Sequence, residues 1–365
     1  MSPSGERRFP FAVHPVLFFG SHRATQARTD VAIEAIAPPV VWTLSTRVVH
    51  CPQAVDLICI DQPRRFSMLA SDRDNGDMPM PRSDSLVTYP GGALSGRSVV
   101  LLTVTRDDQI LVLTESTPCH PVDPRWPDQG PDLGTLAAGE ASAPLTDCVI
   151  GASDGSALFV GDEVPVRRGE PGWAFVVVHV LAAGGLIPVE GDEVLLTVDA
   201  AHRAALSAGH TGCHLAAVAL NAALAARWRK PVRTDGLGHP DFDQLAIVSS
   251  TIVPDGAVDT YRLGRSLRKK GFDVDGLAVS LPEIAADANH RLAGWVASGA
   301  CVDLTVGGPR LTDLREWVCV LPEGTQRIPC GGTHLRSLAE VTAVDVELVI
   351  DEAIGELVMT TRVRR

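Results

Sequence analysis

The 365-residue sequence predicts an α+β protein, in which a small β-barrel or sandwich precedes a domain of helices set against an antiparallel sheet. Three observations support this prediction. Short β-branched runs separated by glycine and proline occupy residues 96–200. A long alanine- and leucine-rich stretch with helical periodicity follows, and further strand patterns continue to the C-terminus. We therefore divide the chain into an extension over 1–95, a β domain over 96–200 and an α+β domain over 201–365.

The extension, residues 1–95, shows weak periodicity. It contains adjacent prolines at 38–39 and a polar stretch from Ser71 to Ser85, and its apolar runs are short. Nothing in this pattern organises the runs into a sheet or a helix pair. Two interpretations stay open: a small accessory domain, or a partly disordered extension.

The β domain is predicted to consist of short strands. Val99–Thr105 and Gln109–Thr114 are rich in β-branched residues and leucine, and the Arg-Asp-Asp sequence between them predicts a hairpin. Glycine-aspartate pairs at 161–162 and 191–192 are typical of turns. Many short strands without a long helix indicate a small barrel or a sandwich. The other expected strands are Ala157–Val160, Trp173–Leu181 and Glu193–Asp199.

The α+β domain is predicted to contain two long helices. His202–Trp228 has no proline, and its apolar residues recur at spacings of three and four, as in an amphipathic helix. The second helix is expected to begin at a capping box formed by Ser280 and Glu283 and to end at Gly299. The expected strands are Leu245–Ile252, Val258–Leu263, Cys301–Val306, Glu316–Leu321, Val344–Ile350 and Leu357–Val363.

Two pairs of metal-binding side chains lie in this domain. His210 and His214 are four residues apart and therefore share one face of the first helix. Cys330 and His334 flank a Gly-Gly-Thr sequence, whose two glycines allow a sharp turn and a close approach to a ligand. Zinc prefers a tetrahedral set of nitrogen and sulfur ligands. The sequence therefore predicts one Zn²⁺ per chain, bound by these four residues, over the alternative of a buried histidine pair beside an unrelated turn.

The histidine pair is not the motif of a thermolysin-type protease. That motif needs a glutamate after the first histidine as the general base, and Thr211 occupies this position. Cys213 lies near the same helix face and is expected to be a small buried residue.

Composition limits the classes of function. A formal net charge of −12 argues against broad, nonspecific nucleic-acid binding and is compatible with a local basic patch. The eight cysteines lack the spacing of a disulfide framework, which favours reduced thiols and metal ligation. No apolar stretch reaches the ~20 residues of a membrane span, and the N-terminus lacks the pattern of a signal peptide. We expect a cytoplasmic protein without a membrane or DNA partner.

The motifs His210-x-x-x-His214 and Cys330-Gly-Gly-Thr-His334 resemble those of the editing domain of alanyl-tRNA synthetase and of the freestanding AlaX proteins. The resemblance extends from about residue 97 to the C-terminus and includes Thr117–Pro121 and Gly134–Leu136. It implies a small β-barrel followed by a two-layer α+β editing-type domain, in agreement with the elements above. It also implies zinc-dependent hydrolysis of the ester that joins serine or glycine to alanine tRNA, which would be the partner.

The resemblance also implies where substrate would bind. Small polar residues that sense the hydroxyl of serine are expected near the metal, and the candidates are Ser249, Ser250 and Thr251 together with the turn residues Gly331, Gly332 and Thr333. Two basic runs are candidates for contacts to tRNA phosphates, namely Arg227, Arg229, Lys230, Arg265, Arg268 and Lys269. The alternative interpretations are exposed strand positions for the first set and solvated helix ends for the second. Val122–Gln129 stands where the family usually has a Gly-Gly-Gly-Gln loop, so the resemblance does not assign the tRNA contacts made through that loop to residues of this chain.

Two rival functions stay open. One is a zinc hydrolase of a small amino-acid ester or amide, and the other is a non-catalytic RNA-binding module in which zinc only stabilises the fold. A basic rim around the metal would favour tRNA, whereas an acidic or neutral rim would favour a small substrate. The sequence leaves the oligomeric state open, and it also leaves open whether His334 is a permanent ligand.

Overall fold

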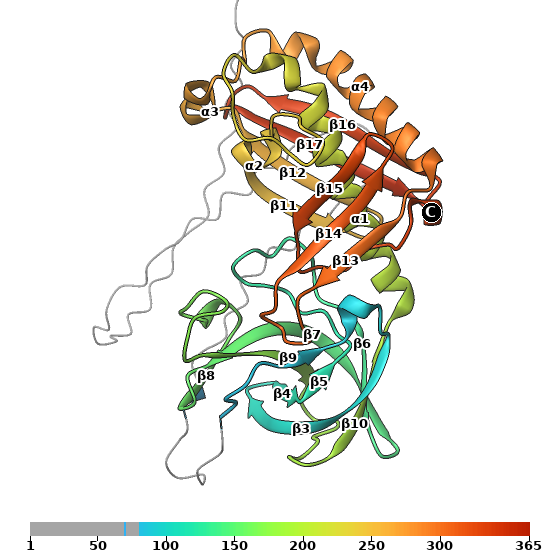
Figure 1. The fold of residues 1–365 in the computed structure, drawn as a ribbon. Helices are drawn as coiled ribbons and strands as arrows, with labels where there is room; N and C mark the ends of the chain where they lie inside the picture. The colour runs from blue at the N-terminus through green and yellow to red at the C-terminus, as the bar shows by residue number, and fades with distance from the viewer. Residues whose placement is uncertain (1–68, 71–79) are drawn as a thin grey trace, which may run out of the picture. The chain divides into compact units, whose positions relative to one another are not determined.

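The structure, a computed structural model, describes Leu69–Ala70 and residues 80–365, which belong to one compact unit spanning Gln62–Arg365. Most of the predicted extension 1–95 thus lies outside the described residues. Its described part, residues 80–95, is not a separate segment, because Met80, Val87 and Tyr89 are buried in the hydrophobic core. The fold is a mixed α+β arrangement, as predicted (Figure 1).

The first half of the described chain is an eight-stranded sheet with the order β1-β8-β7-β6-β10-β3-β4-β9, in which β7 also pairs with β9. The hairpin predicted over residues 99–114 is confirmed as β3 and β4. β6 and β7 were not predicted, because alanine, serine and proline weaken their strand pattern. The strands are β1 (Leu69–Ala70), β3 (Ser95–Arg106), β4 (Gln109–Thr114), β6 (Gly134–Ala138), β7 (Ala141–Ser153), β8 (Ala157–Val160), β9 (Ala174–Ala182) and β10 (Glu193–Val198).

Both faces of this sheet are covered where β9 lies between β4 and β7. Alternate side chains of a strand point to opposite faces. Val177 accordingly joins one buried cluster, whereas Val176 and Val178 join another. Burial on both faces explains why β9 lacks alternation between apolar and polar residues. Short elements complete this half: β2 (Leu86–Val87), which pairs with β5 (Ser116–Thr117), and the 3₁₀ turns η1 (Tyr89–Gly91) and η2 (Gly161–Glu163).

The second half combines two long helices with a four-stranded antiparallel sheet of order β11-β12-β17-β16 and a three-stranded sheet of order β13-β14-β15. The helices α1 and α4 contact each other and the four-stranded sheet, so they cover one of its faces. The elements are α1 (Ala200–Ala223), η3 (Ala225–Arg227), α2 (Phe242–Ala246), β11 (Ile247–Val253), β12 (Gly256–Arg262), α3 (Arg265–Lys270), α4 (Leu277–Ser298), β13 (Val302–Val306), β14 (Arg315–Leu321), β15 (Gly324–Pro329), η4 (Leu338–Glu340), β16 (Ala343–Asp351) and β17 (Glu356–Arg364).

The start of α4 differs from the prediction. The helix begins at Leu277, and the Ser280 hydroxyl donates to the Gly276 carbonyl instead of capping the helix. The predicted capping box is therefore wrong. Leu277 is buried, and this burial favours the additional turn although it places Pro282 inside the helix. The predicted end is confirmed, because Gly299 adopts the left-handed conformation of a helix C-cap.

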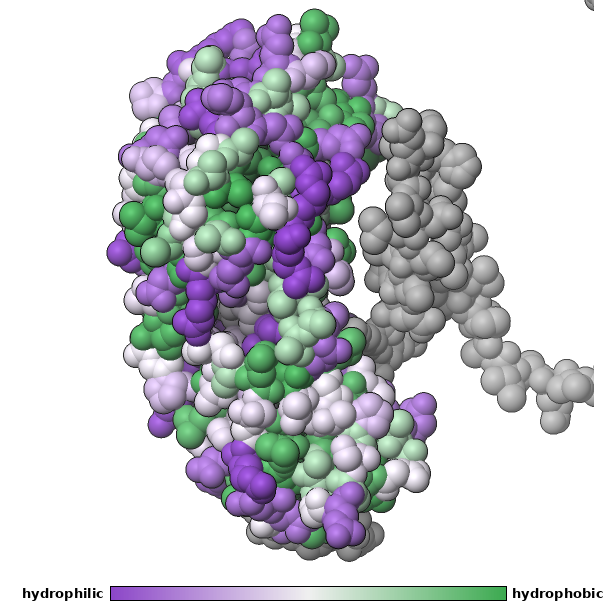
Figure 2. Space-filling view, turned by 90° about the vertical axis from the view of Figure 1, so that its right-hand side faces the viewer, coloured by the Kyte–Doolittle hydropathy of each residue, from purple (hydrophilic) through white to green (hydrophobic). Residues whose placement is uncertain are grey.

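The surface of the described residues mixes polar and apolar side chains. On the face that Figure 2 shows, hydrophilic and hydrophobic residues alternate without one large apolar patch. In the described part of the chain, no helix has both the length and the apolar character needed to cross a membrane.

Candidate metal centre

The four predicted metal ligands lie together. His210 and His214 come from α1, and Cys330 and His334 come from the loop after β15. Their ligand atoms all lie within 4.8 Å of one another. Cys330 Sγ is 3.4 Å from Nε2 of His210 and 3.2 Å from Nε2 of His334. One ion could therefore be bound by all four side chains.

The environment of the cluster fits a divalent cation. Burial lowers the pKa of His214 to about 3 and holds the pKa values of His210 and His334 well below their usual range, so the imidazoles are neutral. Burial also raises the pKa of the Cys330 thiol to about 12, and a thiolate there would need a positive partner. Nε2 of His214 is buried and has no hydrogen-bond partner among the described residues. A metal that binds nitrogen and sulfur would satisfy these groups, and the set is compatible with zinc.

Hydrogen bonds fix which ring nitrogen of two ligands faces the cluster. His210 donates from Nδ1 to Oε1 of Gln129 at 2.7 Å, which leaves its Nε2 free for a metal. Nδ1 of His334 lies 3.3 Å from the hydroxyl of Thr211, a residue of α1. Contacts of this kind orient histidine ligands and strengthen them as donors.

Gln129 connects the two halves of the described chain at this point. Its Oε1 also accepts from the Thr333 backbone N–H at 3.0 Å, and its Nε2 donates to the Thr333 hydroxyl at 2.9 Å. That hydroxyl accepts from Ser207 as well. Gln129 was missed by the sequence analysis, since it ends the loop that departs from the family pattern. A lone glutamine in such a loop carries no signal of its partner.

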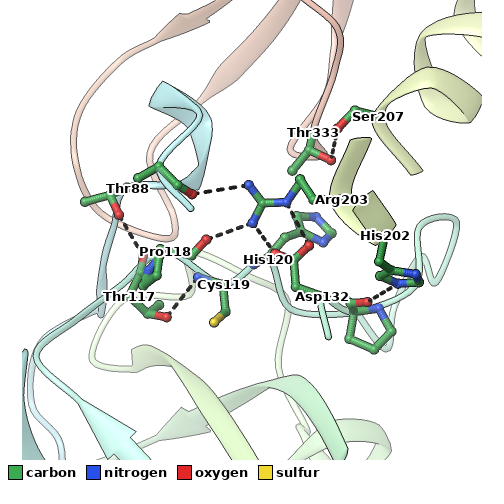
Figure 3. Close-up of polar contacts among 12 residues, drawn as sticks. Thr88, Thr117, Pro118, Cys119, His120, Asp132, His202, Arg203, Ser207 and Thr333 are labelled. Atoms are coloured by element: carbon green, nitrogen blue, oxygen red, sulfur yellow. Dashed lines mark hydrogen bonds and ion pairs between the residues drawn. The ribbon is translucent and has the colours of Figure 1, made fainter. Parts of the chain in front are cut away.

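A buried ion pair holds this loop against the start of α1 (Figure 3). Arg203 donates through Nε to Oδ1 of Asp132 at 2.7 Å and through a second nitrogen to the Pro118 carbonyl. Asp132 in turn accepts from the backbone N–H of His120. Arg203 and Asp132 are 5% and 0% exposed, so water does not compete for these bonds. The pair therefore fixes both ends of the loop that carries Gln129.

The two glycines of the turn have different roles. A Cβ on Gly332 would lie 2.3 Å from Cε1 of His210 and 2.6 Å from Oε1 of Gln129. A Cβ on Gly331 would meet nothing closer than 3.7 Å, where the Arg168 guanidinium lies. Only Gly332 is thus required by a close approach to other protein atoms, whereas Gly331 lines the cleft.

The metal-binding cluster opens into a cleft of about 900 Å³. Of the predicted serine-sensing residues on β11, Ser250 lines this cleft, whereas Ser249 and Thr251 are exposed and do not. Among the turn residues, Gly331 and Gly332 line it and Thr333 lies behind them, bound to Gln129.

The lining of the cleft has two kinds of charge. Four arginines come from the loop around residue 125, the loop after η2, and β14: Arg125, Arg167, Arg168 and Arg315. Asp243 of α2 and Asp259 of β12 line it together with Cys213, and three further aspartates lie in the segments that carry the arginines: Asp123, Asp128 and Asp313. Cys213 is buried, as predicted, and its thiol donates to both carboxylate oxygens of Asp259 at 3.5 Å. The rim is therefore neither uniformly basic nor uniformly acidic.

The basic residues that were predicted to contact tRNA lie outside the cleft. Arg229 and Arg268 form ion pairs with Asp273 and Asp275, and Arg227 donates to the carbonyls of the same two residues. None of the six basic residues that were predicted to contact tRNA lines the cleft. All six lie in the described part of the chain: Arg227, Arg229, Lys230, Arg265, Arg268 and Lys269.

Two further polar residues of the cleft were not predicted as functional. A carboxylate oxygen of Asp128 lies 3.8 Å from Nε2 of His210, and burial raises the pKa of Asp128 to about 6. His120 packs edge-on against the ring of Tyr89, and burial lowers its pKa to about 4. Nδ1 of His120 is buried without a hydrogen-bond partner in the described part of the chain.

No protein-family model matches the chain, and no curated protein matches it at a significant level. The chemistry of the site is therefore what indicates the function.

Proposed function

We propose that the chain is a zinc-dependent hydrolase that cleaves the aminoacyl ester of mischarged tRNA in trans, as the AlaX-type proteins that it resembles do. The substrates would be serine or glycine esterified to alanine tRNA. One observation carries this proposal: the His/Cys cluster lies in a cleft whose lining includes both arginines and aspartates, with Asp243 and Asp259 on elements that carry none of the lining arginines. An aminoacyl-tRNA end has an ammonium group on one side of its ester and phosphodiesters on the other. Opposite charges in the cleft would suit both ends.

The bound zinc would supply electrophilic chemistry, by polarising the ester carbonyl or by lowering the pKa of a water molecule. His210, His214 and Cys330 would hold it, and His334 would be a fourth ligand that gives up its position to water or to the ester carbonyl, because a zinc with four fixed protein ligands has no position for either. Gln129 and Thr211 would keep the imidazoles of His210 and His334 oriented, as their contacts to Nδ1 suggest.

The remaining chemistry needs little from the protein, because an aminoacyl ester is already activated. A positioned water and stabilisation of developing charge are sufficient. Asp128 would orient the attacking water as a hydrogen-bond acceptor, since its carboxylate lies beside the ligand nitrogen of His210. The Ser250 hydroxyl, which lines the cleft, would form a hydrogen bond with the hydroxyl of a serine substrate, so that alanine, which lacks this group, would bind less tightly.

We also propose that the eight-stranded sheet contains a closed β-barrel. The support is the second pairing of β7: the order β7-β6-β10-β3-β4-β9 returns to β7 through the β7–β9 ladder. Closure of this kind removes sheet edges and places alternate side chains inside.

The decisive experiment is a deacylation assay with seryl-, glycyl- and alanyl-tRNA, with and without a chelator. We expect release of serine and glycine, sparing of alanine, and loss of activity when zinc is removed. The rate should fall with added salt, because arginine side chains that bind phosphates release counterions. Asp128→Asn should keep the metal and lower kcat. If metal-replete protein leaves all three esters at their spontaneous rates, the proposal is wrong.

The acidic residues of the cleft favour one alternative, hydrolysis of a small amino-acid ester. Asp243 and Asp259 could bind a substrate ammonium without any nucleic acid. A protein that hydrolyses serine methyl ester at least as efficiently as seryl-tRNA would support this alternative. A protein that binds tRNA with zinc but cleaves neither ester would be a binding module.

A further inference from the structure

We propose that the arginine-lined side of the cleft binds the 3′-terminal nucleotide of an RNA, with Arg168 at a phosphate and Trp126 stacked on a base. This inference rests on the proposed function and assigns residues that the resemblance does not supply. It also moves the RNA contact away from the two basic runs that the sequence suggested.

Arg168 is close to the metal-binding turn. Its guanidinium nitrogens lie 3.7 and 3.8 Å from the position of a Cβ on Gly331, directly after the ligand Cys330. The side chain is 41% exposed and forms an ion pair with Asp123 at 3.3 Å. A guanidinium has five N–H donors, and its fork matches the oxygens of a phosphate. Arg168 can therefore keep Asp123 and still present donors to a ligand in the cleft.

The two loops that form this side of the cleft are tied together. Arg125 donates from Nη2 to the carbonyl of Val164 at 2.8 Å, and the pair of Arg168 with Asp123 makes a second link. Arg167, which directly precedes Arg168 in the chain, is exposed and also lines the cleft. Loops held in this way lose less conformational entropy when a ligand binds. The arginines are thus organised before any phosphate arrives.

Trp126 lies among these arginines. It lines the cleft and is 46% exposed, although an indole ring is usually well buried. Backbone hydrogen bonds on either side fix its position, from Trp126 N–H to the Asp123 carbonyl and from Asp128 N–H to the Trp126 carbonyl. An exposed aromatic ring beside cationic side chains is the usual platform for a single-stranded base, which can stack on any ring of this kind.

The charge pattern supports a local contact. The chain is acidic overall, so it should not bind an RNA along its whole surface. Arg229 and Arg268 of the basic runs are paired with aspartates, and Arg168 of the cleft is paired with Asp123 in the same way. What distinguishes the cleft side is that it joins three arginines of two loops to an aromatic ring next to the His/Cys cluster. One terminal nucleotide, whose ester would then reach the metal, fits this arrangement.

The test compares Arg168→Gln and Trp126→Ala with the control Arg97→Gln. Arg97 is an exposed arginine of β3 with one ion pair, to Glu193 at 2.7 Å, and it does not line the cleft. Dissociation constants would be measured for uncharged alanine tRNA with and without its terminal adenosine, and zinc content would be checked in each variant. We expect wild-type protein and Arg97→Gln to bind the intact tRNA about tenfold more tightly than the shortened one. In the other two variants this preference should disappear.

Kinetics give a second measurement. On seryl-tRNA, Arg168→Gln should lower kcat/KM about tenfold, mainly through KM, because it removes binding made before the reaction. Trp126→Ala should lower kcat/KM about tenfold as well, with a part of the loss in kcat, because the Trp126 side chain also hydrogen-bonds Asp128. If the wild type deacylates seryl-tRNA and both variants behave like Arg97→Gln, the nucleotide site is wrong and the proposed function stands. If the wild type neither binds nor deacylates tRNA, both are wrong. Displacement of the tRNA by adenosine monophosphate at equal concentration would also overturn the RNA assignment, in favour of a free nucleotide.

Discussion

Adding one methyl group at Gly332 should disrupt the metal centre, whereas the same change at Gly331 should not. In Gly332→Ala the new Cβ would lie 2.3 and 2.4 Å from Cε1 and Nδ1 of His210 and 2.6 Å from Oε1 of Gln129. Carbon atoms in contact normally stay ~3.5–4.0 Å apart, so the imidazole or the turn must move by about 1 Å. Both are fixed, because His210 is buried and Gln129 also binds Thr333.

The expected loss of zinc affinity in Gly332→Ala follows from the narrow range of ligand distances that a metal site tolerates. Ligand distances vary by only ~0.2 Å around their preferred values. Loss of the Gln129 contact to His210 would alone weaken metal affinity ~10–100-fold. Displacement of the ligand nitrogen adds to this, so we expect a loss of at least about 100-fold, or ~2.7 kcal/mol. In Gly331→Ala the nearest atom is at 3.7 Å, an ordinary contact, and zinc affinity should stay within about threefold of wild type.

The assay is zinc competition with a chromophoric chelator, performed on wild type and both variants, with circular dichroism to verify that each is folded. The neighbouring glycines make a matched pair, since each change adds one methyl group to the same turn. Folded Gly332→Ala protein with wild-type zinc affinity would refute the proposed role of the close approach. Equal losses in both variants would show that the turn needs glycine for its backbone alone.

Three further expectations concern the ligand set, a buried carboxyl and the chain boundary. Cys330→Ser should lose most of the roughly one zinc per chain that a four-ligand site holds, as measured by atomic absorption. Burial raises the pKa of Asp259 from 3.8 to about 7, so the folded state binds this proton more tightly than the unfolded chain and stability falls as pH rises from about 4 to 7. Asp259→Asn should therefore raise the free energy of unfolding by up to about 4 kcal/mol at pH 8 and hardly at all at pH 4, as measured by urea titration. Equal effects at pH 8 and pH 4 would show that burial of the ionised carboxylate is not the cause. A protein beginning at Ser95 would lack the buried side chains of Val87 and Tyr89, so its Tm should fall well below that of a protein beginning at residue 62. Equal Tm values would show that these side chains do not stabilise the core.

The sequence was informative where the relevant pattern is local. The i,i+4 spacing of His210 and His214 and the Cys330–His334 turn were sufficient to predict a cluster that the structure brings together. Helix α1 and the hairpin of β3 and β4 were found because their apolar periodicity spans many residues. The start of α4 was misplaced because a plausible cap at Ser280 competed with the burial of Leu277, which depends on tertiary packing.

The parts that could not be predicted depend on contacts between distant segments. Gln129 is 81 residues from His210 in the chain, and Asp132 is 71 residues from Arg203. A sequence without an alignment contains no signal that joins such pairs. Strand β11 shows the same limit at short range. Alternation separates Ser250 from its neighbours on the strand, but only the packed structure determines which face lines the cleft.

Neither half of the described chain holds a complete site. The second half supplies all four metal ligands, whereas the first half supplies Gln129, Asp128 and Arg168. The orientation of His210 thus depends on a loop that Arg203 and Asp132 hold in place. Because that loop also carries Trp126, the contacts that position the ligand and those proposed for the nucleotide belong to one connected network. An RNA end whose contacts tighten the hold of this loop on His210 should therefore strengthen zinc binding, and zinc should strengthen RNA binding by the same factor.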